Sequence, residues 1–124
     1  MPWNLNGDTP IYSQIIEHIK LRIAIGELKA GDKLLPVREL AAEAAVNPNT
    51  MQKALAELER QGFVYSQRTS GRFITEETDK IKTLRETLAG EQIEYFLKKM
   101  NSLGYTKEDA IDLLKNYNIG EELS

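Results

Sequence analysis

Two helical patterns separated by only two residues constrain the fold more than any other feature of the sequence. The first pattern occupies residues 36–45, and its buried side is expected to hold Val37, Leu40, Ala41 and Ala44. The second begins at Asn47, a residue type that suits a helix N-cap, is followed by a proline suited to the first helical position, and is expected to end at Gly62. Because residues 46–47 are too few for anything but a tight turn, the pair is predicted to form a helix-turn-helix.

The residues on either side of this pair predict one more helix and a hairpin. A helix is expected over residues 9–25, with Thr9 as N-cap, Pro10 at its first position and an apolar stripe of Tyr12, Ile15, Ile16, Ile19 and Ile23. After the third helix the hydrophobic period changes from 3.6 to 2, which predicts a β-hairpin of residues 63–67 and 72–75. Helix, helix, tight turn, helix and hairpin is the order of a winged helix-turn-helix.

The remainder of the chain predicts two further helices. One covers residues 78–102, where Gly90 is compatible with a kink, a break or an uninterrupted helix. The other opens at Thr106–Asp109, a sequence that resembles a capping box. The expected fold class is therefore mainly α with a small β-hairpin wing. A winged helix-turn-helix domain is assigned to residues 1–75, and a C-terminal two-helix appendage to residues 76–124.

Composition excludes several classes of protein. The 124 residues contain no cysteine and one histidine, His18, so a disulfide framework, a thiolate nucleophile and a multi-histidine metal site are all ruled out. The chain has neither a glycine-rich phosphate loop nor a facing pair of carboxylates, and we expect no catalytic residue, no metal and no cofactor. No apolar run reaches the roughly 20 residues of a membrane span. The N-terminus also lacks the basic start of a signal peptide, so we expect a cytoplasmic protein without membrane contact.

The charge is divided unevenly along the chain. A net charge of −3 disfavours a nucleic-acid partner when it is taken as a whole. Residues 1–75, however, carry nine basic and eight acidic side chains, whereas residues 76–124 carry seven basic and eleven acidic ones. This asymmetry favours two parts with different roles, although a chance distribution of surface charge would give the same totals.

The polar side of the third predicted helix carries the residue types that read DNA bases. Asn49, Gln52 and Lys53 stand at i, i+3 and i+4, so they project from one side. Asparagine and glutamine can pair bidentately with adenine, and lysine can reach guanine or a phosphate. Thr50 and the first free backbone N–H groups of the helix could hold a phosphate. The alternative is a solvated helix face without a partner.

The predicted hairpin turn adds cations next to this helix. Its residues are Arg68, Thr69, Ser70, Gly71 and Arg72. Two arginines around a small tip could enter a minor groove or grip the DNA backbone, and the alternative is an ordinary polar turn.

The C-terminal helices are more apolar than a domain of about 75 residues would cover. A second copy of the chain is the simplest cover, which predicts a two-fold symmetric dimer. The expected interface residues are Ile81, Leu84, Leu88, Ile93, Phe96, Leu97, Met100 and Leu114. Packing of some of them against the first helix of the same chain is the alternative.

Five segments resemble the N-terminal domain of GntR-family transcriptional regulators. They are residues 9–15 (TPIYSQI), 26–34 (GELKAGDKL), 37–41 (VRELA), 46–50 (VNPNT) and 58–64 (LERQGFV). The similarity covers roughly residues 9–75 without a gap. The segment Leu103–Asp109, between the two last helices, is similar to the YtrA-like subfamily, which has a short helical dimerisation region.

The resemblance implies a bacterial winged-helix repressor that binds double-stranded operator DNA as a homodimer, and a palindromic operator. The positions that contact DNA in the family correspond to Arg38, Asn47, Asn49, Thr50, Arg68, Thr69 and Gly71. Members of the subfamily often regulate transporter operons. Pro36 replaces the serine that usually caps the second helix. Some members have arginines where Pro48 and Gln52 stand, so their guanine contacts do not carry over.

Two other roles stay open at this stage. A winged helix used only for protein–protein contact would also fit the acidic balance, and it predicts no salt-dependent binding to DNA. An unknown small-molecule effector is compatible with DNA binding, but two short helices leave little room for an enclosed pocket of roughly 300 Å³. Any effector site would therefore lie at the dimer interface or between the domains.

Overall fold

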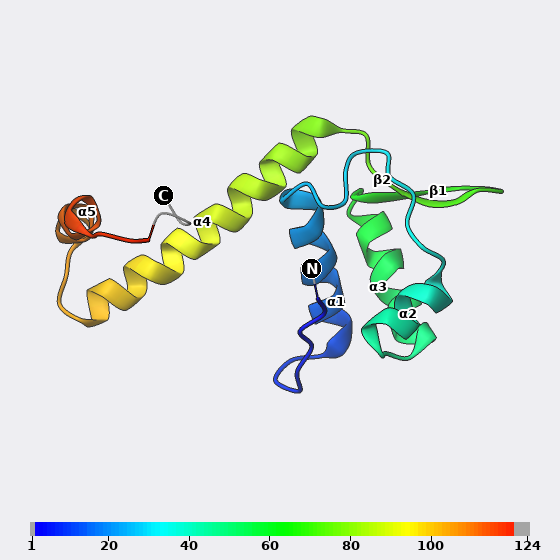
Figure 1. The fold of residues 1–124 in the computed structure, drawn as a ribbon, viewed down its shortest axis with the longest axis horizontal. Coiled ribbons are helices and arrows are strands. Elements are labelled where there is room, and N and C mark those ends of the chain that lie inside the picture. Colours follow the sequence, from blue (N-terminus) through cyan, green and yellow to red (C-terminus); the bar gives the residue numbers. More distant parts are fainter. Residues whose placement is uncertain (1, 121–124) are drawn as a thin grey trace. The chain divides into compact units, whose positions relative to one another are not determined.

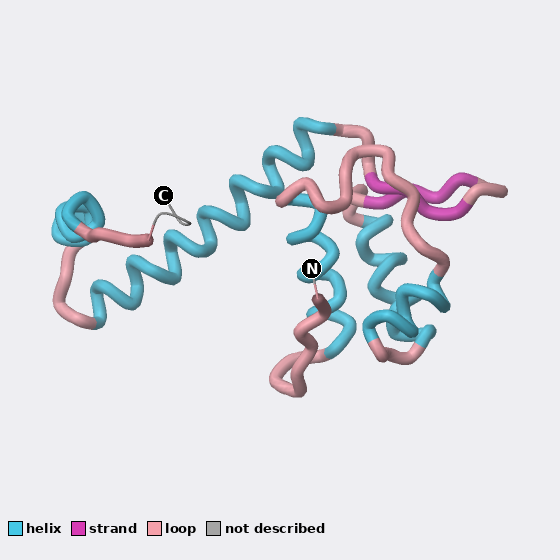
Figure 2. Tube along the Cα trace, in the orientation of Figure 1, coloured by secondary structure: helices cyan, strands magenta, loops and turns pink. Residues whose placement is uncertain are grey.

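A computed structural model describes residues 2–120 of the chain (Figure 1). The elements are α1 (Ile11–Ala24), α2 (Val37–Ala44), α3 (Pro48–Arg60), β1 (Val64–Gln67), β2 (Gly71–Ile74), α4 (Thr78–Ser102) and α5 (Lys107–Asn116). Helices dominate, and β1 and β2 form one antiparallel hairpin (Figure 2). The predicted fold class, mainly α with a β-hairpin wing, is therefore confirmed. The chain divides into two compact units after Arg85, inside α4, whereas the sequence placed the boundary after residue 75.

The core of the first unit lies where α1 and α3 pack side by side (Figure 1). Its largest fully buried side chains are Ile15, Ile19, Ile23, Met51, Leu55, Leu58, Val64 and Ile74, each exposed by 1% or less. Full burial of one such side chain stabilises the fold by about 1.5–3 kcal/mol. Tyr12 is a correction to the predicted stripe, since it is 36% exposed. It sits in the first turn of α1 and lines an open groove beside the polar residues of α3.

The helix ends follow the sequence signals with one exception. Asn47 caps α3 as predicted, because its Oδ1 accepts a hydrogen bond from the backbone N–H of Asn49 at 2.7 Å. Gly62 ends that helix with a φ of 85°, a left-handed conformation that favours glycine. The exception is α1, where Pro10 and not Thr9 is the N-cap. Pro10 has an extended backbone, with φ −54° and ψ 134°, and helical geometry begins at Ile11.

The hairpin is extended by a third short segment. In the ladder Val64 pairs with Ile74 and Gln67 pairs with Gly71. On the other side of β2, the N–H of Leu34 donates to the carbonyl of Arg72 at 2.9 Å. Where β2 ends, the backbone N–H of Thr75 donates to Phe63 O at 2.9 Å, and its buried hydroxyl accepts from the N–H of Glu77, just before α4, at 3.1 Å.

The N-terminal residues are attached to the first unit by an aromatic stack. Trp3 lies on His18 with ring centroids 4.0 Å apart, and its Nε1 donates to Glu43 of α2 at 3.2 Å. Gln14 accepts from the backbone N–H of Asn6 and donates back to the carbonyl of Asn6, both at 2.8 Å. Burial, followed by the nearby charge of Arg22, lowers the pKa of His18 below its usual 6.5.

The second unit has almost no core of its own. α4 continues through Gly90, and α5 starts with the predicted capping box, in which Thr106 and Asp109 bond to each other's backbone N–H. Among the described residues from Glu86 onward, only Ala110 is buried. A groove of about 340 Å³ is lined by Phe96, Met100, Leu113, Leu114 and Tyr117.

Within residues 2–120, no helix combines the length and the hydrophobicity needed to cross a membrane. The same residues hold no group of three or more His, Cys, Asp or Glu side chains placed to bind a metal ion.

Ala45 in the turn between α2 and α3 generates a stability prediction. It has φ 56° and ψ 47°, a left-handed conformation that costs an alanine about 1–2 kcal/mol. Ala45→Gly removes this strain, but glycine is also freer than alanine in the unfolded chain, which offsets part of the gain. We expect a net rise in the free energy of unfolding of about 0.5–1 kcal/mol. Denaturant unfolding measures this. Ala42→Gly, inside α2 and exposed, is the control and should destabilise by about 1 kcal/mol. Equal destabilisation by both variants would contradict the assigned strain.

The stack of Trp3 on His18 generates a pH prediction. Trp3 is the only tryptophan of the chain, so the tryptophan fluorescence reports on the surroundings of this one ring, which include His18 and Glu43. Since the pKa of His18 is lowered in the folded protein, the unfolded chain binds the proton first as the pH falls below 6.5. His18 therefore contributes fully to the free energy of unfolding above pH 6.5. This contribution is lost as the pH falls from 6.5 to the pKa that His18 has in the folded protein. We expect a fluorescence transition with its midpoint below pH 6.5 that is absent in His18→Gln. A midpoint at or above 6.5 would refute this account.

Candidate DNA-binding surface

The exposed side of α3 is a row of polar side chains. Asn49, Gln52 and Lys53 are exposed, while Met51 and Leu55 on the opposite side are buried, as the helical period predicted. The core between α1 and α3 fixes this orientation, because burying one side of α3 turns the other side outward.

The first turn of α3 differs from the sequence expectation. Free backbone N–H groups were expected there as a phosphate site, together with Thr50. Pro48 has no N–H, however, and that of Asn49 is bound by the Asn47 cap. The N–H of Thr50 donates to the carbonyl of Asn47 at 3.0 Å. The side chains of this turn, rather than its backbone, are left for a ligand.

The wing presents an exposed cationic tip. Arg68, Thr69 and Ser70 form its exposed turn, and Gly71 follows with a φ of 106°, which only glycine adopts readily. Arg68 makes no hydrogen bond or ion pair within residues 2–120. Lys33 was not among the predicted site residues. Its Cε lies 3.4 Å from the place where a Cβ on Gly71 would be, so it adds a cation beside the wing.

Arg72 is turned toward α3 and is only 20% exposed at its side chain. Its Nε lies 3.6 Å from Glu59 Oε1, and its Nη1 donates to Gln52 Oε1 at 3.3 Å. The two arginines of the wing thus have different surroundings: Arg68 lies at the tip, and Arg72 at the base against α3.

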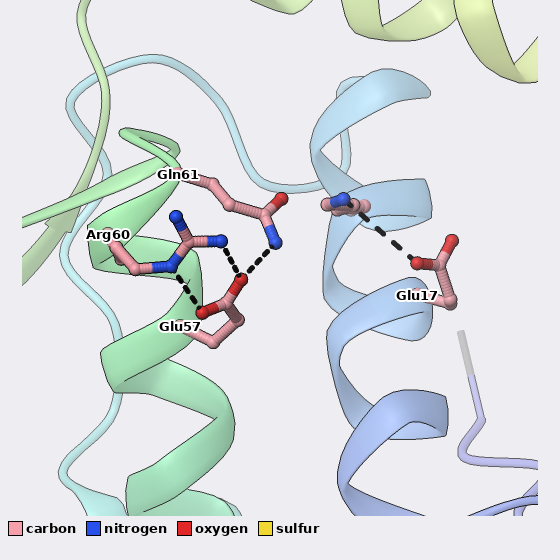
Figure 3. A network of polar contacts seen from close by, with 5 residues as sticks. Glu17, Glu57, Arg60 and Gln61 are labelled. Carbon is pink, nitrogen blue, oxygen red and sulfur yellow. Dashed lines mark hydrogen bonds and ion pairs between the residues drawn. The ribbon is translucent and has the colours of Figure 1, made fainter.

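A second ion pair neutralises one cation of α3. Glu57 accepts from Arg60 Nε and Nη2, each at 2.6 Å, and from Gln61 Nε2 at 2.7 Å (Figure 3). The bonds from Arg60 and then from Gln61 lower the pKa of Glu57 to about 2, so this carboxylate stays ionised at neutral pH. Lys53 and Arg38, which is exposed on α2, make no such pair within the described residues. Among residues 2–120, four cations of the first unit that form no ion pair with a carboxylate are Lys33, Arg38, Lys53 and Arg68.

The predicted dimer residues have unequal exposure within one chain. In the first unit Leu84 is buried and Ile81 is half-buried, and Leu88, in the second unit, is half-buried as well. In the second unit Phe96, Leu97 and Met100 are half-buried. Ile93 and Leu114 are the most accessible, with 58% and 59% of their surface exposed. Leu84 therefore has little surface left for a second chain.

Residues 11–74 match the family described as bacterial regulatory proteins, gntR family. The chain is 42% identical over 111 residues to the uncharacterized HTH-type transcriptional regulator YhcF of Bacillus subtilis, covering 90% of this chain and 92% of the relative. It is 49% identical over 70 residues to the HTH-type transcriptional repressor YtrA of the same organism, covering 56% and 54%.

Solved structures agree with these relatives. A GntR family transcriptional regulator from Listeria monocytogenes matches with a TM-score of 0.83 and 40% identity, covering 92% of this chain and all of that one. AraR(DBD) in complex with operator ORX1 matches with a TM-score of 0.54 and 28% identity, covering 58% of this chain and 93% of that one.

Arg60 is paired with Glu57, whereas Arg38 has no carboxylate partner among the described residues, and this difference generates a prediction. Arg38→Ala should weaken binding to every duplex sequence and lower the slope of log affinity against log salt concentration by about one unit, because one phosphate contact is lost. Arg60→Ala is the matched control, since Glu57 already neutralises Arg60, and it should change the slope less. Fluorescence anisotropy with labelled duplex DNA at several salt concentrations measures both. An equal change of slope in the two variants would remove Arg38 from the interface.

Proposed function

Because the chain belongs to the GntR family of bacterial regulatory proteins, we propose that it represses transcription by binding a two-fold symmetric operator as a homodimer. It is a DNA-binding transcriptional regulator and not an enzyme. The observation that carries the proposal is the exposed row of Asn49, Gln52 and Lys53 on α3, with the cationic wing beside it.

The residues of this surface divide into two kinds of contact. Asn49, Gln52 and Lys53 carry donors and acceptors for base edges in the major groove. The remaining predicted contacts, which position the protein on the sugar–phosphate backbone or in the minor groove, are Arg38, Asn47, Thr50, Arg68, Thr69, Ser70, Gly71 and Arg72. Lys33 joins this second group because of its place beside Gly71.

The lack of a core in the second unit supports the homodimer. The described residues of the second unit, from Glu86 to residue 120, bury only Ala110 and so cannot cover their own apolar side chains. Ile93, Tyr95, Leu103 and Leu114 are each more than half exposed. A second copy of the same unit would remove this surface from water, and its two-fold axis would match a palindromic operator.

The regulated genes and the effector are further parts of the proposal. Resemblance to the YtrA-like subfamily supports a transporter operon as the target. An apolar small molecule would fit the groove of about 340 Å³ in the second unit, which is near the lower size limit of ligand pockets.

The decisive experiment is selection of bound sequences from random duplex DNA at a stated, physiological salt concentration. We expect a two-fold symmetric consensus, because a dimer presents two copies of α3. Enrichment of no sequence would overturn operator binding and would favour a winged helix used only for protein contact.

Ile93→Asp tests the dimer interface separately from the DNA-binding unit. A buried carboxylate at the interface should convert the dimer to a monomer in analytical ultracentrifugation and lower operator affinity by about a hundredfold or more, since one half-site alone remains. Gln92→Asp introduces the same charge at the neighbouring exposed position and is expected to leave both properties unchanged. A dimer that survives Ile93→Asp would place the interface elsewhere.

A further inference from the structure

A chain of polar contacts joins the wing to the exposed row of α3. Arg72 Nη1 donates to Gln52 Oε1 at 3.3 Å, and Arg72 Nε lies 3.6 Å from Glu59 Oε1. Ser66, the partner of Arg72 across the hairpin, donates to the same oxygen of Glu59 at 2.5 Å. Gln52 and Glu59 stand two turns apart on α3 and therefore on the same side of the helix. The wing is thus in contact with a side chain that faces DNA in the proposed function.

The backbone of Arg72 is held on both sides. It belongs to the ladder with β1, and its carbonyl accepts from the N–H of Leu34 at 2.9 Å. Its guanidinium lies against Glu59, and the side chain is only 20% exposed. Because the backbone of Arg72 is held in the sheet and its guanidinium lies against a carboxylate, the side chain keeps little rotamer freedom. It therefore orients the groups that it contacts.

Arg72 determines the orientation of the side-chain amide of Gln52. The two ends of a glutamine amide have similar shapes, and the hydrogen-bond partners determine which end is oxygen. A guanidinium has donors only, so the end of Gln52 that faces Arg72 must be the acceptor Oε1. The two N–H donors of Nε2 are then the groups left for another partner.

We propose that Arg72, held by Glu59, is a positioning residue that turns Gln52 into a reader of acceptors and gives the protein a preference for guanine over adenine at the base pair that Gln52 contacts. In the major groove guanine presents two acceptors, N7 and O6, whereas adenine presents the acceptor N7 beside the donor N6. The bidentate pairing with adenine requires Oε1 to accept from N6, but this oxygen faces Arg72, whose positive charge opposes the approach of a second donor to its remaining lone pair. The adenine pairing expected from the sequence applies to a free glutamine.

This inference rests on the proposed function, because Gln52 must reach a base for its orientation to matter. The test uses the full chain and the operator obtained by selection. Gln52→Ala first identifies the operator position whose base preference depends on Gln52. We expect the wild-type protein to prefer guanine to adenine at that position.

Arg72→Met removes the donors and the charge but keeps a long side chain. We expect the guanine-over-adenine ratio of affinities at that position to fall about fivefold or more, the size of one base contact. In the Gln52→Ala background the same substitution should change the ratio no further, since Arg72 acts through Gln52. Arg68→Met, at the wing tip, is the matched control and should weaken all operator variants equally.

The outcomes separate this inference from the proposed function. If Arg72→Met weakens every operator variant equally, or if the wild-type protein prefers adenine, the positioning role is refuted while operator binding stands. If the wild-type protein enriches no sequence, operator binding fails and the inference fails with it. Glu59→Gln provides a second variant should Arg72→Met not fold, and an unchanged ratio in folded Glu59→Gln would equally refute the role.

Discussion

The apolar contact between α1 and α3 is the interaction on which the rest of the first unit depends. This contact removes apolar side chains of both helices from water almost completely. They are Ile15, Ile19 and Ile23 of α1 and Leu55 and Leu58 of α3. A helix with one side buried has only one orientation, so the polar row of α3 is turned outward by hydrophobic packing and not by any polar contact of its own. The orientation of the candidate DNA-binding surface is thus a consequence of how the core packs.

The wing is held by hydrogen bonds on both sides of β2 and by the burial of Val64 and Ile74. β2 is the middle of three extended segments, with β1 on one side and Leu34 on the other. This arrangement places Arg72 beside α3 and leaves Arg68 in the turn. Phe63, at the entry to the hairpin, lies near two ammonium groups, those of Lys20 at 5.4 Å and Lys80 at 5.1 Å from the ring centroid. Contacts with a residue of α1 and a residue of α4 thus help to hold the entry to the hairpin.

Local signals in the sequence were sufficient for the elements but not for the contacts between them. The Asn47 cap, the end of α3 at Gly62 and the capping box at Thr106 depend on neighbours within a few residues, and all three were predicted. The occupied N–H groups of the first turn of α3 could have been anticipated, because a capping asparagine followed by proline leaves few donors free. The positions of Lys33 and Arg72 could not have been anticipated, since they result from the pairing of β2 with β1 and with the segment at Leu34. Period and spacing contain no information on which cation a hairpin turns toward a helix.

The hydroxyl of Thr75 has a consequence for the order in which the chain folds. It accepts from the N–H of Glu77, the residue whose carbonyl receives the first hydrogen bonds of α4, while the backbone of Thr75 is itself bonded to Phe63. Starting a helix is the costly step of its formation, because several residues are ordered for one hydrogen bond. Closure of the hairpin places Thr75 where it can order this first turn, so the wing is expected to act as a nucleus for α4.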